Sequence, residues 1–241
     1  MLIPSETLLA AALIGVYLVD SMSFLALGEA VIRTRGCSLA GLACGSTLEL
    51  GGRRPFLPNP LTPFWPELRL EWATWAAPGV PAAAAAREMA AHLAALRGVG
   101  RLAGACALLM VIGAPLALLL SAPRVFLACA FLTYLCAALA GTLVVARRRA
   151  LGLSLPQALG LLAVGIVCLP CAANLARSAG TRRRWLLAAA EVPALGFSAA
   201  RAADVRRELV DALRYAARFL AADGAEARVI GAQLARLEGG A

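Results

Sequence analysis

The chain has 241 residues, of which 61% are hydrophobic and only 15% charged, and its formal net charge is +9. A soluble domain of ordinary composition has about 45–50% apolar and about 25% charged residues. The composition excludes disordered, collagen-like and coiled-coil proteins and disfavours a purely water-soluble globule. All 23 residues counted as lysine or arginine are arginine, and the chain is rich in alanine, as a GC-rich bacterial coding sequence would be. We therefore expect a mainly α-helical, multi-pass protein of a bacterial inner (cytoplasmic) membrane.

Four apolar windows have the length of a membrane-spanning helix, which is about 20 residues. The windows are residues 8–28, 103–121, 125–146 and 156–175. Only Asp20 places a charge in the first window. Because residues 1–7 contain no lysine or arginine, we expect this window to be a retained helix and not a signal peptide. The sequence thus predicts about four transmembrane helices in the lipid bilayer.

The second and third windows are separated only by residues 122–124, and so short a connection predicts an antiparallel helical hairpin. Pro115 removes one backbone hydrogen bond inside the second window, so we expect a kink there. In the third window Ala137 and Gly141 are four residues apart. This spacing of small residues predicts a face on which another helix packs closely.

Arginine predicts the orientation of these helices, because cytoplasmic loops carry the excess of positive charge. By this rule the first helix runs from outside to inside, and the next two alternate. The fourth window conflicts with the rule, since seven arginines and no acid lie between Arg147 and Arg184, on both sides of it. Either this segment bends at Pro170 and is re-entrant, or residues 185–200 complete a hairpin. The side of the C-terminal tail stays open between these alternatives.

Residues 29–101 are too long for a simple connection, and we expect a loop region with a small β element on the membrane surface. Two alternating runs flank Gly51-Gly52, a pattern typical of a β-hairpin. Residues 68–72 alternate in the same way and predict a third strand. Three such short strands are marginal alone, so they should contact the helices or a partner.

A proline-rich segment follows this hairpin and cannot be helical, because residues 58–66 contain four prolines. We interpret Phe64 and Trp65 as anchors in the lipid headgroup region, and a polyproline II ligand is the alternative. Further along, residues 81–97 have a helical pattern that we expect to end at Gly98.

Residues 198–238 have the pattern of two amphipathic helices that are broken at Asp223-Gly224. Seven arginines and six acids leave this tail nearly neutral. Binders of nucleic acid or anionic lipid carry an excess of positive charge. We therefore expect the two helices to pair with each other or with a protein partner, and we expect no nucleic acid.

Asp20 is the sharpest candidate for a functional residue, because a charge within a membrane helix costs about 2.5–3.5 kcal/mol on insertion scales. Such side chains usually face the interior of a bundle and have a partner. The candidate partners are Ser21, Ser23, Thr133 and Tyr134, and the candidate cations are Arg33 and Arg124. We interpret Asp20 as a polar contact between helices or subunits, and a proton or ion relay is the alternative.

Two pairs of cysteines suggest thiol redox chemistry, namely Cys168 with Cys171 in a CxxC motif, and Cys37 with Cys44 in the loop region. Cysteines three residues apart on a helix are more often small apolar residues. His92 is the only histidine, and no other ligands are spaced to join it in a metal site. We expect His92 to be structural or solvated, with no metal and no cofactor.

Sequence motifs of common enzymes are absent, including the Walker loop, GxGxxG after a strand, HExxH and GxSxG. We therefore expect a non-catalytic membrane protein, acting as an accessory, scaffold or assembly subunit that binds other membrane protein subunits or copies of itself. The alternative is a small oligomeric transporter or channel with Asp20 on its pathway. A remote alternative is a membrane thiol-disulfide oxidoreductase that uses Cys168 and Cys171.

Overall fold

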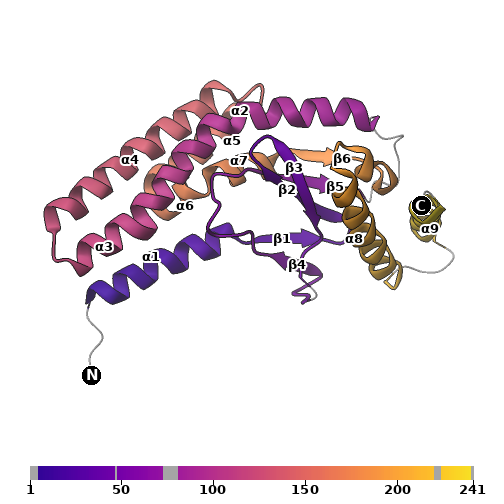
Figure 1. The fold of residues 1–241 in the computed structure, drawn as a ribbon, viewed down its shortest axis with the longest axis horizontal. Coiled ribbons are helices and arrows are strands. Elements are labelled where there is room, and N and C mark those ends of the chain that lie inside the picture. The colour runs from indigo at the N-terminus through magenta and orange to yellow at the C-terminus, as the bar shows by residue number, and fades with distance from the viewer. Residues whose placement is uncertain (1–4, 47, 73–80, 220–223, 240–241) are drawn as a thin grey trace. The chain divides into compact units, whose positions relative to one another are not determined.

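The structure is a computed structural model that describes residues 5–46, 48–72, 81–219 and 224–239 (Figure 1). As predicted, the chain is mostly helical with some strands. It divides into two compact units. The helical unit comprises residues 1–22, 57–66 and 92–183, and the mixed unit comprises residues 23–56, 67–91 and 184–241.

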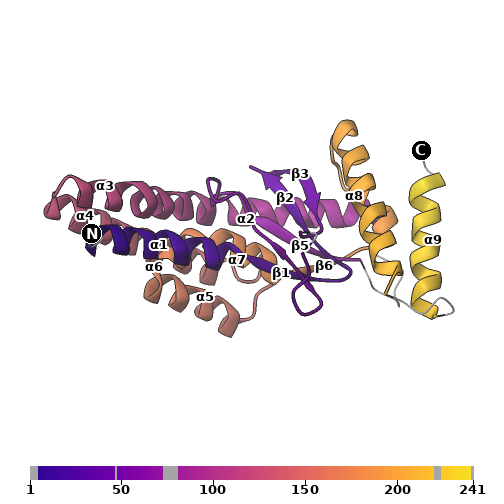
Figure 2. The same cartoon turned by 90° about the horizontal axis from the view of Figure 1, so that it is seen from below.

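The helical unit is built from long and short helices that lie beside one another. They are α1 (Ser5–Ser21), the greater part of α2 (Ala82–Leu108), the π-helical turn η1 (Leu109–Gly113), α3 (Ala114–Leu119), α4 (Pro123–Ala146), α5 (Leu155–Val167), α6 (Leu169–Ala173) and α7 (Leu175–Arg182). α4 runs back along η1 and α3 (Figure 1, Figure 2). The antiparallel hairpin expected from the short connection is therefore present.

α2, η1 and α3 follow one another directly, so one helical run extends from Ala82 to Leu119. The prediction that a helix ends at Gly98 is wrong. A glycine inside a helix costs about 1 kcal/mol relative to alanine, but here glycine permits close packing. A Cβ placed on Gly100 would lie only 2.5 Å from the carbonyl oxygen of Phe64. The glycines of this run mark a packing surface and not a helix end.

The kink expected at Pro115 takes the form of the π-helical turn η1. This turn ends two residues before Pro115, whose ring nitrogen has no hydrogen to donate to the carbonyl four residues earlier. Within the described part of the chain, two helices are long and apolar enough to cross a membrane, the run Ala82–Leu119 and α4. That is fewer than the four predicted.

The first predicted window, residues 8–28, is helical only in part. α1 ends at Ser21, and strand β1 begins at Ser23, so the expected helix end at residue 28 is wrong. Residues 23–26 instead form antiparallel pairs with Arg53–Phe56. The hydropathy of the window gives no sign of this distant partner, and pairing with it outweighs the local tendency to extend the helix.

The fourth window, residues 156–175, is not one straight helix. α5 ends at Val167 after 13 residues, which is about 20 Å of helix and too short for a hydrocarbon core of about 30 Å. The chain turns at Cys168, the N-cap of α6, and α7 returns along α5. This geometry agrees with the re-entrant alternative, although the turn begins two residues before Pro170.

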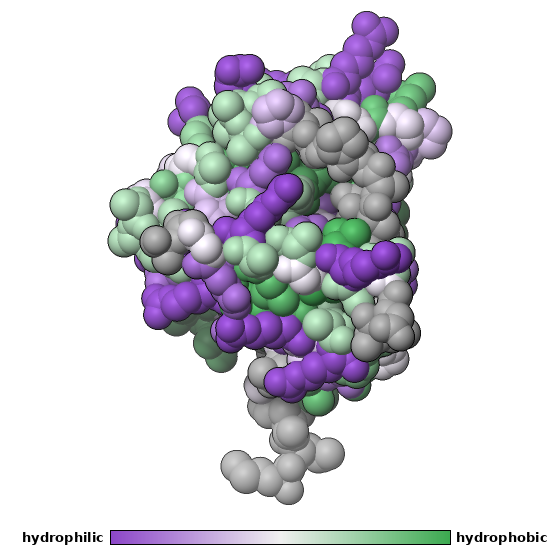
Figure 3. All heavy atoms as spheres, turned by 90° about the vertical axis from the view of Figure 1, so that its right-hand side faces the viewer, coloured by the Kyte–Doolittle hydropathy of each residue, from purple (hydrophilic) through white to green (hydrophobic). Residues whose placement is uncertain are grey.

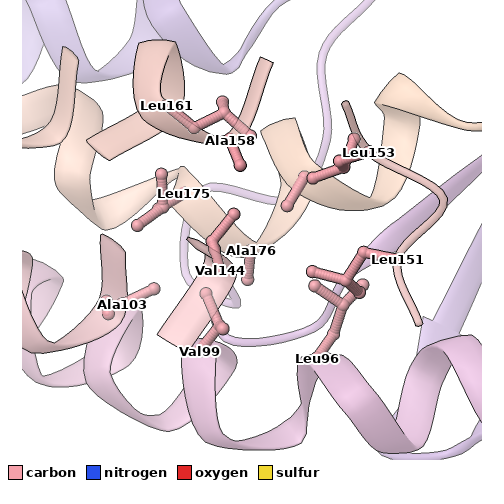
Figure 4. Packing of buried hydrophobic residues seen from close by; sticks show 12 residues of the cluster. Leu96, Val99, Ala103, Val144, Leu151, Leu153, Ala158, Leu161, Leu175 and Ala176 are labelled. Carbon is pink, nitrogen blue, oxygen red and sulfur yellow. The ribbon is translucent and has the colours of Figure 1, made fainter. Parts of the chain in front are cut away.

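The core of the helical unit lies where this returning segment meets α2 and α4. Figure 4 shows Val99 of α2 and Val144 of α4 pointing toward the same cluster as Leu161 of α5 and Leu175 of α7. The small-residue face predicted on α4 is close-packed, since a Cβ on Gly141 would lie 2.4 Å from Cδ1 of Leu162. Burial of these apolar side chains fixes α5 and α7 against the two long helices.

The mixed unit contains two sheets and two further helices. Its elements are β1 (Ser23–Ala26), β2 (Glu29–Arg35), β3 (Ser38–Ala43), β4 (Arg53–Phe56), β5 (Glu67–Glu71), β6 (Arg184–Leu186), the 3₁₀ turn η2 (Ala189–Ala194), α8 (Ala199–Ala217) and α9 (Ala225–Gly239). One sheet pairs β1 with β4, and the other has the order β3-β2-β5-β6. Among the strand pairs of the described residues, only β5–β6 is parallel.

The β prediction was right about a turn and a strand but wrong about their partners. Leu50 and Arg53 bridge across Gly51-Gly52, as a tight turn requires, yet β4 pairs with β1 and not with a strand over residues 48–50. Residue 47, the first of the run before this turn, lies outside the described residues. Most of the third predicted strand is present as β5, which pairs with β2. Residues 185–200 give β6 and η2, so the alternative that they complete a membrane hairpin is wrong.

The two tail helices are present as α8 and α9, and they contact each other. Val205 and Leu209 of α8 are buried, as are Ile230 and Leu237 of α9. An ion pair between Arg214 and Glu238, 2.7 Å apart, joins the same helices. The predicted pairing is therefore observed between the tail helices, while the expected break at Asp223-Gly224 lies partly outside the described residues.

Candidate functional site: a buried polar network

Asp20 lies in the last turn of α1 and is half-buried. Its carboxylate Oδ2 accepts a hydrogen bond of 3.0 Å from Nδ2 of Asn174. Asn174 lies at the break between α6 and α7. It was not among the partners expected from the sequence, so that part of the prediction is wrong: a neutral amide from the fourth window supplies the contact.

The side chain of Asn174 joins three parts of the helical unit and is only 1% exposed. Its Nδ2 also donates to the carbonyl oxygen of Tyr17, at 3.1 Å. Its Oδ1 accepts from Nη1 of Arg177 at 3.3 Å and lies 3.0 Å from Oγ of Ser21. Both amide hydrogens and the carbonyl oxygen are therefore used, which fixes the orientation of this side chain.

Arg177 carries a positive charge into the interior, where it is only 4% exposed. Its Nη2 donates to two backbone carbonyl oxygens, of Asn59 at 2.5 Å and of Thr62 at 2.9 Å. The hydroxyl of Tyr17 donates to the carbonyl oxygen of Pro60 at 2.5 Å. A proline-rich chain has few backbone N–H groups of its own, so its carbonyl oxygens are available to these donors.

These contacts show how the proline-rich segment 57–66 is held in place, which the sequence did not indicate. The segment is held by Arg177 and Tyr17 on one side, and Phe64 packs on Gly100 and Gly104 of α2. Phe64 is still 41% exposed. The role of Phe64 and Trp65 as headgroup anchors stays a prediction.

The network joins an acid, an amide and a guanidinium in a row: Asp20, Asn174 and Arg177. A buried guanidinium is tolerated when its donors are hydrogen-bonded. Here the guanidinium of Arg177 donates to the carbonyl oxygens of Asn59 and Thr62 and to the side-chain oxygen of Asn174. These hydrogen bonds join α1, the break between α6 and α7, and the proline-rich segment 57–66.

Cys168 and Cys171 are joined by a disulfide in the structure. Cys168 precedes α6 and Cys171 lies within it. The pair therefore lies at the turn between α5 and α6 and not on one continuous helix, as the apolar interpretation assumed. Cys37 and Cys44 are not joined to each other. Burial, with the charge of Glu208, raises the pKa of the Cys44 thiol to about 12, while Arg54 lowers it. Such a thiol is a poor nucleophile.

His92 is buried on α2, only 1% exposed, which fits the structural interpretation and not the solvated one. Across the described residues, no group of three or more histidine, cysteine, aspartate or glutamate side chains could hold a metal ion.

Asn174 and Arg177 are the residues of this site that the sequence analysis missed. Both follow the CxxC motif in a segment that is otherwise small and apolar, and they are three residues apart, on one face of a helix. A polar pair with this spacing was a usable signal.

Comparisons of the chain with protein-family models, with curated proteins and with solved structures gave no match.

Proposed function

We propose that the chain is a non-catalytic, integral protein of a bacterial inner membrane that acts as an accessory or scaffold subunit of a larger membrane complex. The helical unit would lie in the bilayer. The mixed unit would face water and contact other membrane protein subunits or a second copy of the chain.

The observation that carries the membrane part of the proposal is the exposure of the longest apolar helices. In the most apolar 18-residue stretch of the run Ala82–Leu119, only 28% is buried inside the structure. The same share is buried in α4. Large side chains such as Leu119, Phe131 and Val167 face outward, with exposures of 76%, 68% and 85%. The core helix of a soluble protein would bury such residues, whereas lipid accommodates them.

Strand pairing restricts how many times the chain crosses. β5 precedes α2, β6 follows α7, and the two strands pair side by side. Both strands must therefore lie on the same side of the membrane, so the number of crossings between them is even. The run Ala82–Leu119 and α4 supply two crossings, and the segment from α5 to α7 then has to return to the side from which it started.

A re-entrant α5–α7 segment also removes the conflict in the arginine distribution. Arg147–Arg149 and Arg182–Arg184 would both lie on the cytoplasmic side, as the positive-inside rule requires. α1 has 17 residues, close to the shortest length that spans a bilayer. We propose three crossings and one re-entrant segment, with the mixed unit in the cytoplasm.

The polar network favours a scaffold over a transporter. In a transporter or channel, intramembrane polar groups line a path and exchange partners. Here Asn174 is fully hydrogen-bonded and Arg177 holds two carbonyl oxygens, which supports a static role. The thiol-disulfide oxidoreductase stays a remote alternative, and the bond between Cys168 and Cys171 is the observation that favours it.

The proposal is tested by extracting the full chain from its native membranes in a mild detergent and measuring the mass of the purified assembly. A scaffold subunit is expected in a complex of fixed stoichiometry with other membrane proteins. The transporter alternative is tested in parallel, by measuring proton or ion flux into liposomes that contain the native chain or Asp20→Asn. An isolated chain whose flux is lost in Asp20→Asn would overturn the scaffold proposal.

A further inference from the structure

A hollow of about 620 Å³ opens in the mixed unit beside β3, β4 and α8. This volume is within the range of small-molecule sites, about 300–1,000 Å³. All residues around the hollow belong to the mixed unit. Figure 3 views the right-hand side of Figure 1, and strongly hydrophilic side chains project there between apolar ones.

Positive charge predominates around the hollow. Four arginines line it: Arg33 from β2, Arg54 from β4, Arg214 from α8, and Arg218, which directly follows α8. Two carboxylates, Glu208 and Asp211, also line it, and Arg214 is ion-paired with Glu238. These seven groups have a net charge of +1 when all of them are ionised. Arginines that come from three separate elements surround the space and do not form one surface row.

Arg54 is held in position before any ligand arrives. Its Nε donates to the carbonyl oxygen of Ser46 at 2.7 Å, and its guanidinium lies 4.8 Å from the ring centre of Tyr215. A Cβ on Gly45 would lie 2.7 Å from Cβ of Arg54, and Gly45 has a φ of +84°. Glycine is therefore needed here for conformation and for space, and it lets Arg54 approach closely.

Arg33 is positioned by a second glycine. A Cβ on Gly41 would lie 3.2 Å from Nη2 of Arg33, so the guanidinium rests on the bare backbone of β3. The pKa of the nearby Glu208 is raised, mainly by burial. The charge of Arg33 lowers this pKa and the charge of Asp204 raises it further. A weaker tendency of Glu208 to ionise leaves more of the arginine charge available to an anion.

We propose that this hollow binds a phosphate group, carried by a small soluble molecule or by a lipid headgroup. Arginine forks match the oxygens of phosphate and carboxylate alike. A carboxylate offers one planar edge, which a single fork fills, whereas a tetrahedral phosphate accepts from several directions at once. Guanidinium groups from β2, β4 and α8 meet that second geometry. The assignment rests on the mixed unit alone and does not depend on the scaffold proposal.

Binding is measured by calorimetry on the full chain in neutral detergent micelles. The probes are inorganic phosphate, glycerol 1-phosphate and dihexanoyl-phosphatidylglycerol below its critical micelle concentration, each against chloride at equal ionic strength. The native chain is expected to bind at least one phosphate probe. A preference for the lipid probe identifies a headgroup, and equal or better binding of the two soluble probes identifies a soluble ligand.

Charge-matched variants locate the site. Arg54→Gln and Arg218→Gln are each expected to weaken binding about tenfold or more, the usual loss for one charge-assisted contact. Arg53→Gln is the control, because Arg53 adjoins Arg54 on the same strand and is exposed but does not line the hollow. Unfolding midpoints show that each variant is folded. Absence of binding to every probe, or an equal loss in Arg53→Gln, would overturn the proposal.

Discussion

The backbone of Gly152 lies against the side chain of Arg183, since a Cβ placed on Gly152 would be 3.3 Å from Cδ of Arg183. Gly152 precedes α5 and Arg183 directly follows α7. The segment between them therefore leaves from and returns to the same end of the helical unit. This contact and the pairing of β5 with β6 are the observations that support the proposed re-entrant segment.

The polar network makes a first prediction about stability. Asn174→Ala leaves Arg177 and Asp20 without their shared partner, and we expect a loss of about 2–4 kcal/mol of unfolding free energy. Asp20→Asn keeps an oxygen that accepts from Asn174, so its effect should stay below about 1 kcal/mol. Chemical unfolding in detergent micelles, followed by tryptophan fluorescence, measures both. Thr142→Ala, at an exposed position of α4, is the control. If Asn174→Ala is as stable as this control, the network does not hold the unit together.

A second prediction concerns two glycines with opposite surroundings. Gly100→Ala places a methyl group 2.5 Å from the backbone oxygen of Phe64, and backbone cannot move aside cheaply. We expect about 1–3 kcal/mol of destabilisation, as for other overpacked sites. Gly160 of α5 has open space around the same position, so Gly160→Ala should be neutral or stabilising by up to about 1 kcal/mol. The same unfolding measurement compares them, and the reverse order would refute the packing described for α2.

The ion pair of Glu29 and Arg69 makes the stability of the mixed unit depend on pH. Burial raises the pKa of Glu29. Hydrogen bonds from Arg69 and from the backbone N–H of Ala26 lower it, as do the positive charges of Arg69 and Arg184. The lowering outweighs the effect of burial, so the pKa lies below the ordinary value of 4.5. A lowered pKa means that the charged form stabilises the fold. That contribution is complete above pH 4.5 and is lost as the pH falls through the folded-state pKa.

Glu29→Gln is therefore expected to be less stable than the native chain at pH 7, and the difference should shrink as the pH falls below 4.5. Thermal unfolding between pH 7 and pH 3 measures this. Glu226→Gln, at an exposed position of α9, should leave the native pH profile unchanged. A difference between Glu29→Gln and the native chain that stays constant over the whole range would contradict this assignment.

The disulfide makes a fourth prediction. Cys168 and Cys171 enclose only two residues, and so short a loop restricts the unfolded chain little. If the pair is structural, Cys168→Ser with Cys171→Ser should assemble as the native chain does and lose no more than about 2 kcal/mol of stability. The mass of the detergent-extracted assembly and its unfolding curve test this. If the complete assembly forms in only one redox state of Cys168 and Cys171, the oxidoreductase alternative is favoured.

The sequence was a good guide where local patterns decide the structure. The length and uninterrupted hydropathy of residues 125–146 predicted α4 closely, and the recurrence of apolar residues at helical spacing predicted the helices at 199–217 and 225–239. Turn chemistry located Gly51-Gly52. In each case the residues that determine the element lie within the element itself.

Predictions failed where a distant partner decides the structure. Residues 23–26 are as apolar as the helix before them, and they become a strand because β4 is available to pair with them. Gly98 resembles a helix end, but close packing in the folded chain lets the helix continue. Asp20 was recognised as unusual, yet its partner Asn174 is 154 residues away in the sequence, and no spacing rule connects them.

The side of the membrane on which the C-terminus lies tests the central claim most directly. The full chain is fused at its C-terminus to green fluorescent protein or to alkaline phosphatase and expressed in bacteria. A matched pair of fusions after Ser121, between α3 and α4, reports the opposite side. At the C-terminus we predict a fluorescent green fluorescent protein fusion and an inactive phosphatase fusion. After Ser121 we predict a non-fluorescent fusion and an active phosphatase. An active phosphatase at the C-terminus would contradict the re-entrant segment and the cytoplasmic mixed unit.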